Sequence, residues 1–177
     1  ECKLETIGEK AFESANITYV NLPSSLKSIG NRAFSGTQIA HATIPEGVTQ
    51  LGYLVFGNTL TELNYNATNA TYIGGTTNGI FQVNGTIKIG SNVTDIPAQF
   101  SVNAQKLNYI AFPESVVRIG NKAFYNNGNL SSVSLPVKIQ SIGSNAFGSC
   151  TTLKTLTISG SVPDPNGAFT GTTITTI

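Results

Sequence analysis

The sequence predicts a repeat solenoid, mainly β, in which the chain winds through about eight coils of about 22 residues each. Two observations predict this fold. A phenylalanine that closes an Ile-Gly-x-x-Ala-Phe motif returns at nearly constant spacing, and a short block of alternating apolar residues lies between successive motifs. One repeat of this length cannot enclose a core, whereas stacked repeats can, and each coil then satisfies the strand edge of the next.

The Ile-Gly-x-x-Ala-Phe motif is complete at residues 7–12, 29–34, 119–124 and 142–147, and it is degraded at residues 51–56. The closing phenylalanines are Phe12, Phe34, Phe56, Phe81, Phe100, Phe124, Phe147 and Phe169, spaced by 22, 22, 25, 19, 24, 23 and 22 residues. We expect the Ile-Gly step to turn the chain and the Ala-Phe pair to point into the core. The phenylalanines would then form a continuous spine.

The alternating block reads Leu-x-x-Leu-x-Leu and is usually followed by proline. Alternation is the period of a strand, and proline ends a strand because it donates no ladder hydrogen bond. Positions one, four and six should therefore point inward, and positions three and five outward. The third-position row is Tyr19, His41, Glu62, Thr86, Tyr109, Ser132, Thr155 and Thr176. The fifth-position row is Asn21, Thr43, Asn64, Lys88, Ala111, Ser134 and Thr157.

Two neighbouring coils depart from the regular spacing. Residues 66–79 carry an insertion, and the coil that ends at Phe100 is short. We expect the solenoid to bulge or distort at these coils.

The pattern resembles the leucine-rich repeats of the BspA type, which occur in bacterial surface proteins and some protist ones. The segments that carry the resemblance are residues 26–34 and 130–143, continued by Ala146 and Phe147, and Cys150 matches a cysteine common at that family position. The resemblance covers essentially the whole chain. It implies one right-handed leucine-rich-repeat superhelix over residues 1–177, with short parallel strands on one face and turns, short strands and 3₁₀ pieces on the other.

The composition excludes several classes of partner. Only 11% of the residues are charged, well below the ~25% of an average soluble domain, and 16 Ser, 22 Thr and 18 Asn take their place. With ten basic residues and nine acidic ones, the chain lacks the excess of positive charge that nucleic-acid binding requires, so a nucleic-acid partner is not expected. No apolar run approaches the ~20 residues of a membrane span, so direct membrane insertion is not expected.

The sequence offers no catalytic, cofactor or metal site. His41 is the only histidine, and its position in the block places it on the exposed strand face. The two aspartates, Asp95 and Asp164, have no partner pattern around them, and no Cys-x-x-Cys or phosphate-binding loop occurs. We therefore expect the protein not to be an enzyme. Cys2 and Cys150 should lie roughly 25–30 Å apart, too far for a disulfide, with Cys150 a small buried residue.

Three functions remain open. The first, which the resemblance favours, is a cell-surface or secreted module that adheres to a host or extracellular-matrix protein through the strand face. The second is a structural spacer in a larger surface protein, and the third is a non-catalytic module for a surface glycan. The candidate contact residues are outward residues of the two rows, namely Tyr19, Asn21, His41, Thr43, Glu62, Asn64, Lys88 and Tyr109. Tyr19 and Tyr109 are the large amphipathic side chains among them, and tyrosine is enriched at binding hot spots. We expect the protein to be a monomer. Because both ends fall within a repeat, we also expect the chain to be part of a longer protein.

Overall fold

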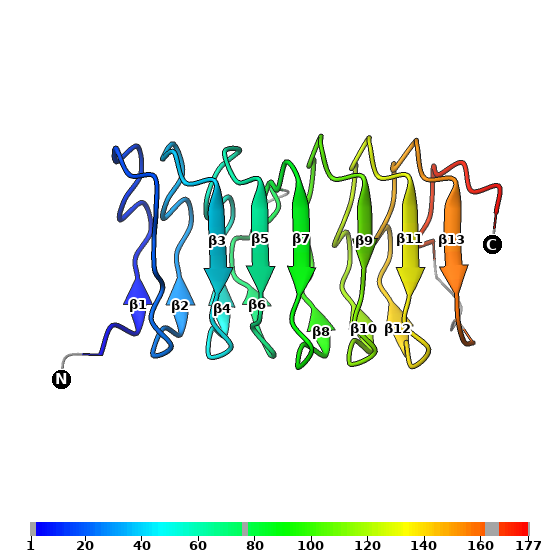
Figure 1. The fold of residues 1–177 in the computed structure, drawn as a ribbon, viewed down its shortest axis with the longest axis horizontal. Coiled ribbons are helices and arrows are strands. Elements are labelled where there is room, and N and C mark those ends of the chain that lie inside the picture. Colours follow the sequence, from blue (N-terminus) through cyan, green and yellow to red (C-terminus); the bar gives the residue numbers. More distant parts are fainter. Residues whose placement is uncertain (1–2, 76–77, 162–166, 177) are drawn as a thin grey trace.

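The computed structural model describes residues 3–75, 78–161 and 167–176, which form a parallel β-solenoid (Figure 1). Six strands of three or four residues lie side by side along one wall, which we call the strand face. They are β3 (His41–Ile44), β5 (Glu62–Tyr65), β7 (Thr86–Ile89), β9 (Tyr109–Ala111), β11 (Ser132–Leu135) and β13 (Thr155–Ile158). The fold predicted from the repeat is thus confirmed.

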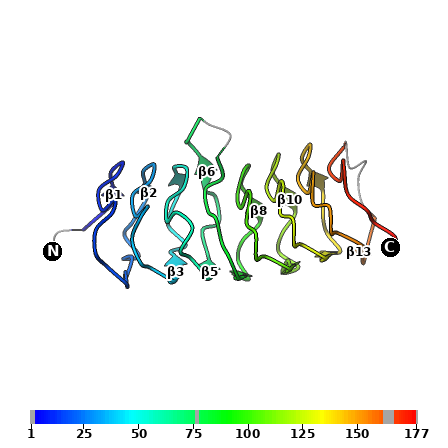
Figure 2. The same ribbon diagram turned by 90° about the horizontal axis from the view of Figure 1, so that it is seen from above.

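A second wall is built from strands of two residues each (Figure 2). They are β1 (Thr6–Ile7), β2 (Ser28–Ile29), β4 (Gln50–Leu51), β6 (Thr71–Tyr72), β8 (Asp95–Ile96), β10 (Arg118–Ile119) and β12 (Ser141–Ile142). Six of these strands end at the isoleucine or leucine of the motif or its variant, which points inward, whereas in β6 the partly buried Tyr72 takes that position. Ile29, Leu51 and Ile119 are buried in this way.

The phenylalanine spine is confirmed, and it is continuous. Each ring contacts the next, with centroids 5.1–5.7 Å apart in six of the steps and 6.4 Å apart between Phe56 and Phe81. Six rings are almost completely buried, whereas Phe12 at the first coil is 44% exposed. The eight spine rings span seven complete turns. Because the interior rings are buried and the ring of Phe12 is half exposed, burial of the spine stabilises the interior coils more than the first one.

Both walls are interrupted beside the short coil that carries β7 and β8, where the repeat spacing departs from the average. The second wall opens before this coil and the strand face after it. The strand face splits into the sheets β3-β5-β7 and β9-β11-β13, and the second wall into β1-β2-β4-β6 and β8-β10-β12. The spine side stays joined, because the Ile80 and Phe81 amides donate to the carbonyls of Gln99 and Phe100. The expected distortion of these coils is therefore confirmed, and it opens the walls without severing the core.

Tyr65, at the end of β5, fills the core beside this interruption. Its ring packs edge-on against Phe100 at 4.8 Å, and the Phe81 and Phe100 rings meet at 78° rather than stacking. Burial, together with the nearby charge of Asp95, raises the pKa of the Tyr65 hydroxyl, which therefore stays protonated. Within the described part of the chain, the buried Tyr65 hydroxyl and Ser101 Oγ have no hydrogen-bond partner. Packing at the interruption is thus less complete than in the regular coils.

The corner that carries the spine consists of turns rather than the expected 3₁₀ pieces, which the described residues do not contain. The reason is a recurring left-handed residue two positions before the spine phenylalanine, as at Lys10, Arg32 and Lys122, with φ of 54–56°. A second left-handed residue follows the phenylalanine, as at Gly36. A helical turn needs consecutive right-handed residues, so the corner cannot continue as one.

The glycine of the Ile-Gly motif has a different role from the one expected. Its backbone at Gly30 is not left-handed, so glycine is not required there to turn the chain. Instead the coils approach so closely that a Cβ on Gly30 would lie 2.5 Å from the Glu9 nitrogen of the preceding coil. The motif therefore preserves the distance between stacked backbones.

Cys150 is completely buried, as expected, and its thiol lies 3.2 Å from the Phe124 carbonyl oxygen, to which it donates a hydrogen bond. Cys2 lies outside the described residues, so its separation from Cys150 stays a prediction. Burial raises the pKa of the Cys150 thiol from 9.0 to about 11, because the thiolate would be desolvated.

We expect Cys150 to resist thiol reagents in the native protein. At a pH near 8, a rise of two pKa units leaves about 100-fold less thiolate than an ordinary cysteine has, and burial slows the reaction further. The measurement is the labelling rate of a Cys2→Ser variant with a chromogenic disulfide, in buffer and in urea. Equal rates in the two conditions would contradict the burial of Cys150.

Candidate partner-binding face

The outward residues of the strand face form the two rows that the alternation predicted. In the first sheet, β5 pairs with β3 and β7 so that His41, Glu62 and Thr86 are register partners. The same pairing aligns Thr43, Asn64 and Lys88 in the second row. Because a parallel register fixes which side chains are neighbours, the six residues come from 48 positions of sequence yet lie on one continuous surface.

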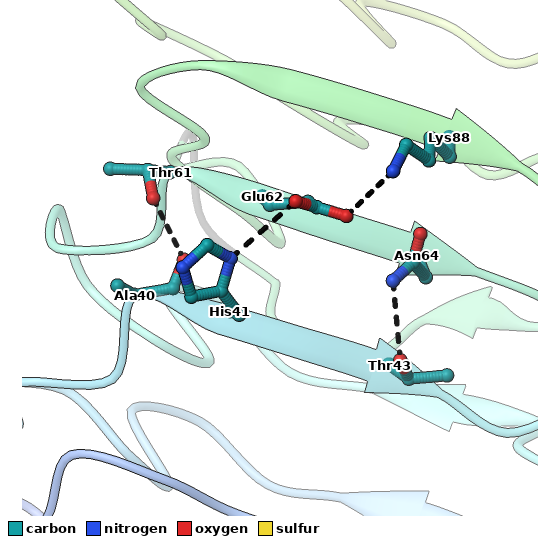
Figure 3. A network of polar contacts seen from close by, with 7 residues as sticks. All are labelled: Ala40, His41, Thr43, Thr61, Glu62, Asn64 and Lys88. Atoms are coloured by element: carbon teal, nitrogen blue, oxygen red, sulfur yellow. Dashed lines mark hydrogen bonds and ion pairs between the residues drawn. The ribbon is translucent and has the colours of Figure 1, made fainter.

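Glu62 is the centre of a charged network on this surface (Figure 3). Lys88 Nζ donates a hydrogen bond of 2.8 Å to one carboxylate oxygen, and His41 Nδ1 lies 3.5 Å from the other. The Lys88 hydrogen bond and charge lower the pKa of Glu62, with a smaller contribution from His41, so the carboxylate is ionised at neutral pH. Exposed ion pairs add little stability, so the main consequence of the network is a fixed arrangement of donors and acceptors.

The second row contributes a neutral contact beside this network. Asn64 Nδ2 donates to Thr43 Oγ1 at 3.4 Å, across the β3–β5 pair (Figure 3). The amide oxygen of Asn64 takes no part in this contact. The face thus presents both hydrogen-bond donors and acceptors, with its charges already paired.

The two tyrosines stand at separate points of the face. Tyr109 begins β9 and is 51% exposed, and Tyr19 is 73% exposed. Four coils separate them, which corresponds to about 19 Å at the usual strand spacing of ~4.8 Å. They cannot grip one small group together, but they can contact two points of an extended partner.

The first alternating block, residues 17–22, is not a strand, contrary to expectation. A single backbone hydrogen bond, from the Gln38 amide to the Ile17 carbonyl, joins it to the coil that carries β3. No ladder forms there. Tyr19 and Asn21 still lie beside His41 and Thr43, around a shallow depression of about 170 Å³.

A family comparison decides which class of solenoid this is. The model for the BspA type leucine-rich repeat region matches residues 1–99 and 82–177, in six copies. The chain belongs to the BspA-type leucine-rich repeat family. No curated protein sequence is significantly similar to it.

Solved structures share the fold of this BspA-type solenoid. A leucine-rich repeat protein from Bacteroides ovatus is 24% identical with a TM-score of 0.58, and the match covers 87% of this chain and 46% of that one. The T. pallidum leucine-rich repeat protein is 24% identical with a TM-score of 0.56, covering 90% and 64%. A leucine-rich cell surface protein from Faecalibacterium prausnitzii is 18% identical with a TM-score of 0.52, covering 89% and 58%. The chain therefore spans less than two thirds of the length of each.

Sequence reasoning missed two grooves of the BspA-type solenoid, one on each wall at the interruption. The groove on the strand face lies between β7 and β9, has a volume of about 420 Å³ and includes Lys88, Tyr109 and Phe112 in its lining. The groove on the second wall lies between β6 and β8, with a volume of about 620 Å³. The only sequence signal for either was the irregular spacing around Phe81 and Phe100.

Within residues 3–75, 78–161 and 167–176, no three His, Cys, Asp or Glu side chains gather in a way that could hold a metal ion. The same ranges contain no helix of the length and hydropathy that a membrane span requires. Asp164 lies outside the described residues. Asp95 pairs with Arg118, contrary to the expectation that it has no partner.

Proposed function

We propose that this BspA-type solenoid is a non-catalytic, monomeric module of the cell surface or of a secreted protein, which binds an extended protein partner through the strand face. The observation that carries the proposal is that Tyr19, the Glu62 network and Tyr109 lie along one wall, with both tyrosines more than half exposed. A host or extracellular-matrix protein would supply such a partner. The surface location is supported by the family and by the cell surface protein from Faecalibacterium prausnitzii that shares the fold.

The two tyrosines are the side chains from which most of the binding energy would come. Each offers a large, rigid, amphipathic surface at a low cost in conformational entropy. The Glu62 network is exposed and internally paired, so it would contribute specificity and register more than affinity. The neutral Thr, Ser and Asn side chains of the other coils supply hydrogen bonds around these anchors.

We expect a Tyr19→Ala/Tyr109→Ala double variant to lose at least ~30-fold in affinity for a protein that the parent binds, as for truncation of hot-spot residues worth ~2 kcal/mol or more. The measurement is binding to immobilised extracellular-matrix proteins, with a glycan panel beside it. Tyr125→Ala is the matched control, because Tyr125 lies at the spine corner, one residue after Phe124, away from the strand face.

The outcomes separate the functions. Saturable protein binding that survives in the double variant would refute the strand-face site. Binding that free sugar abolishes would favour the glycan module. A folded parent that binds neither panel would favour the spacer.

A further inference from the structure

The groove on the second wall is framed by the insertion. The chain that leaves β6, as far as residue 75, rises above the neighbouring coils in Figure 2. No hydrogen-bonded ladder joins β6 to β8, so β6 forms a side wall of the groove and the sheet β8-β10-β12 its floor. A volume of about 620 Å³ lies in the range of small-molecule sites.

Part of the floor of this groove is flat, because small residues lie there. Gly120 and Gly143 come directly after β10 and β12, whereas Pro97 has that position after β8 and is followed by Ala98. A side chain at Gly120 is excluded, since a Cβ there would lie 2.5 Å from the Ala98 nitrogen. Stacking of the coils thus keeps an open surface on which a ring can lie against backbone.

One polar pair stands at the edge of the floor. Asp95, Arg118 and Ser141 are register partners across β8, β10 and β12. Arg118 Nε and Nη2 donate to the two carboxylate oxygens of Asp95, the second at 2.9 Å, and Thr94 Oγ1 donates to Asp95 at 2.6 Å. Three N–H donors of the guanidinium remain beyond those two bonds. Donors and acceptors therefore lie side by side in a planar arrangement.

The charge and the strand edge select the kind of ligand. Asp95 and Arg118 neutralise each other, and the rest of the lining is uncharged, so neither an anion nor a cation is favoured. A peptide strand is disfavoured because Pro97 has no N–H, whereas Gly120 and Gly143 at the equivalent positions donate to the preceding coil. A neutral ligand with adjacent hydroxyl groups fits, since each hydroxyl both donates and accepts.

We propose that the groove between β6 and β8 binds a short neutral saccharide, with a sugar ring on the floor formed by Ala98, Gly120 and Gly143. Adjacent hydroxyls would bond to the Asp95–Arg118 pair. The Tyr72 ring would flank the sugar, its hydroxyl anchored by donation to the Asn78 carbonyl at 2.9 Å. This site lies on a different wall from the strand face and goes beyond the proposed function.

The test is a titration of the ¹⁵N-labelled chain with cellobiose, maltose and N,N′-diacetylchitobiose, followed by amide chemical shifts. We expect saturable shifts at Tyr72, Arg118 and Ser141 for at least one saccharide. Ser141→Trp should fill the groove and weaken binding at least ~10-fold. Ser28→Trp is the matched control, because Ser28 has the same position in β2, outside the groove, and should leave binding unchanged.

Three results would overturn the proposal: no saturable shift with any of the three saccharides, binding that Ser141→Trp leaves intact, or shifts that gather at Tyr19 and Tyr109 instead. Thermal melts of each variant verify folding. If Ser141→Trp does not fold, Arg118→Met removes the donors without filling the floor and should weaken binding by a similar factor. The Tyr19→Ala/Tyr109→Ala variant should bind saccharide normally, which keeps this result independent of the strand face.

Discussion

Replacing Phe34 with alanine is expected to lower the free energy of unfolding by about 3–5 kcal/mol, as for other buried phenylalanines. Phe34 is 1% exposed, and its ring lies between those of Phe12 and Phe56, with centroids 5.2 and 5.1 Å away. The variant loses burial on both sides and leaves a cavity between two coils. For a chain of this size the loss corresponds to a fall in Tm of roughly 6–20 °C.

Phe12→Ala is the matched control for this prediction. Phe12 has the same place in the motif but is 44% exposed and contacts one spine ring rather than two. Its replacement should cost about 1 kcal/mol, since much of the ring is already in water. Urea denaturation of the parent and both variants measures the difference, and equal losses would show that the spine does not carry the core as described.

Replacing Gly30 with alanine is expected to cost at least about 1–3 kcal/mol through overpacking. The added Cβ would lie 2.5 Å from the Glu9 nitrogen and 2.7 Å from the Gly8 carbonyl carbon. These are backbone atoms, so the clash cannot be relieved by a change of rotamer, and the two coils must separate. Separation would lengthen the hydrogen bond of 2.8 Å from the Gly30 amide to the Ile7 carbonyl.

Gly8→Ala offers the comparison within the same motif. A Cβ on Gly8 meets nothing within 4 Å, because no described coil precedes it, and its backbone is not left-handed. The variant should be neutral, or more stable by up to about 1 kcal/mol, because alanine restricts the unfolded chain. Urea denaturation again provides the measurement. A similar loss at both positions would show that glycine is needed for its backbone freedom and not for close stacking.

The residues of the candidate face could be predicted because strand alternation and repeat spacing are local properties of the chain. Once the register is set, the third-position residues of adjacent blocks are neighbours, as are the fifth-position residues, and His41, Glu62 and Lys88 therefore lie in one region of the face. The contacts among them were not predictable. Whether Lys88 pairs with Glu62 or extends into solvent depends on side-chain conformations that the spacing does not specify.

The sequence by itself determined the solenoid, its phenylalanine spine and the inward or outward direction of each strand residue, because these follow from a period that every coil repeats. The role of Gly30, the absence of a strand at residues 17–22 and the opening of the two walls on either side of the coil that ends at Phe100 emerge only in the folded structure. Each of these depends on how two particular coils stack on one another. The distance between two stacked backbones depends on both coils, so it cannot be predicted from the sequence of either repeat alone.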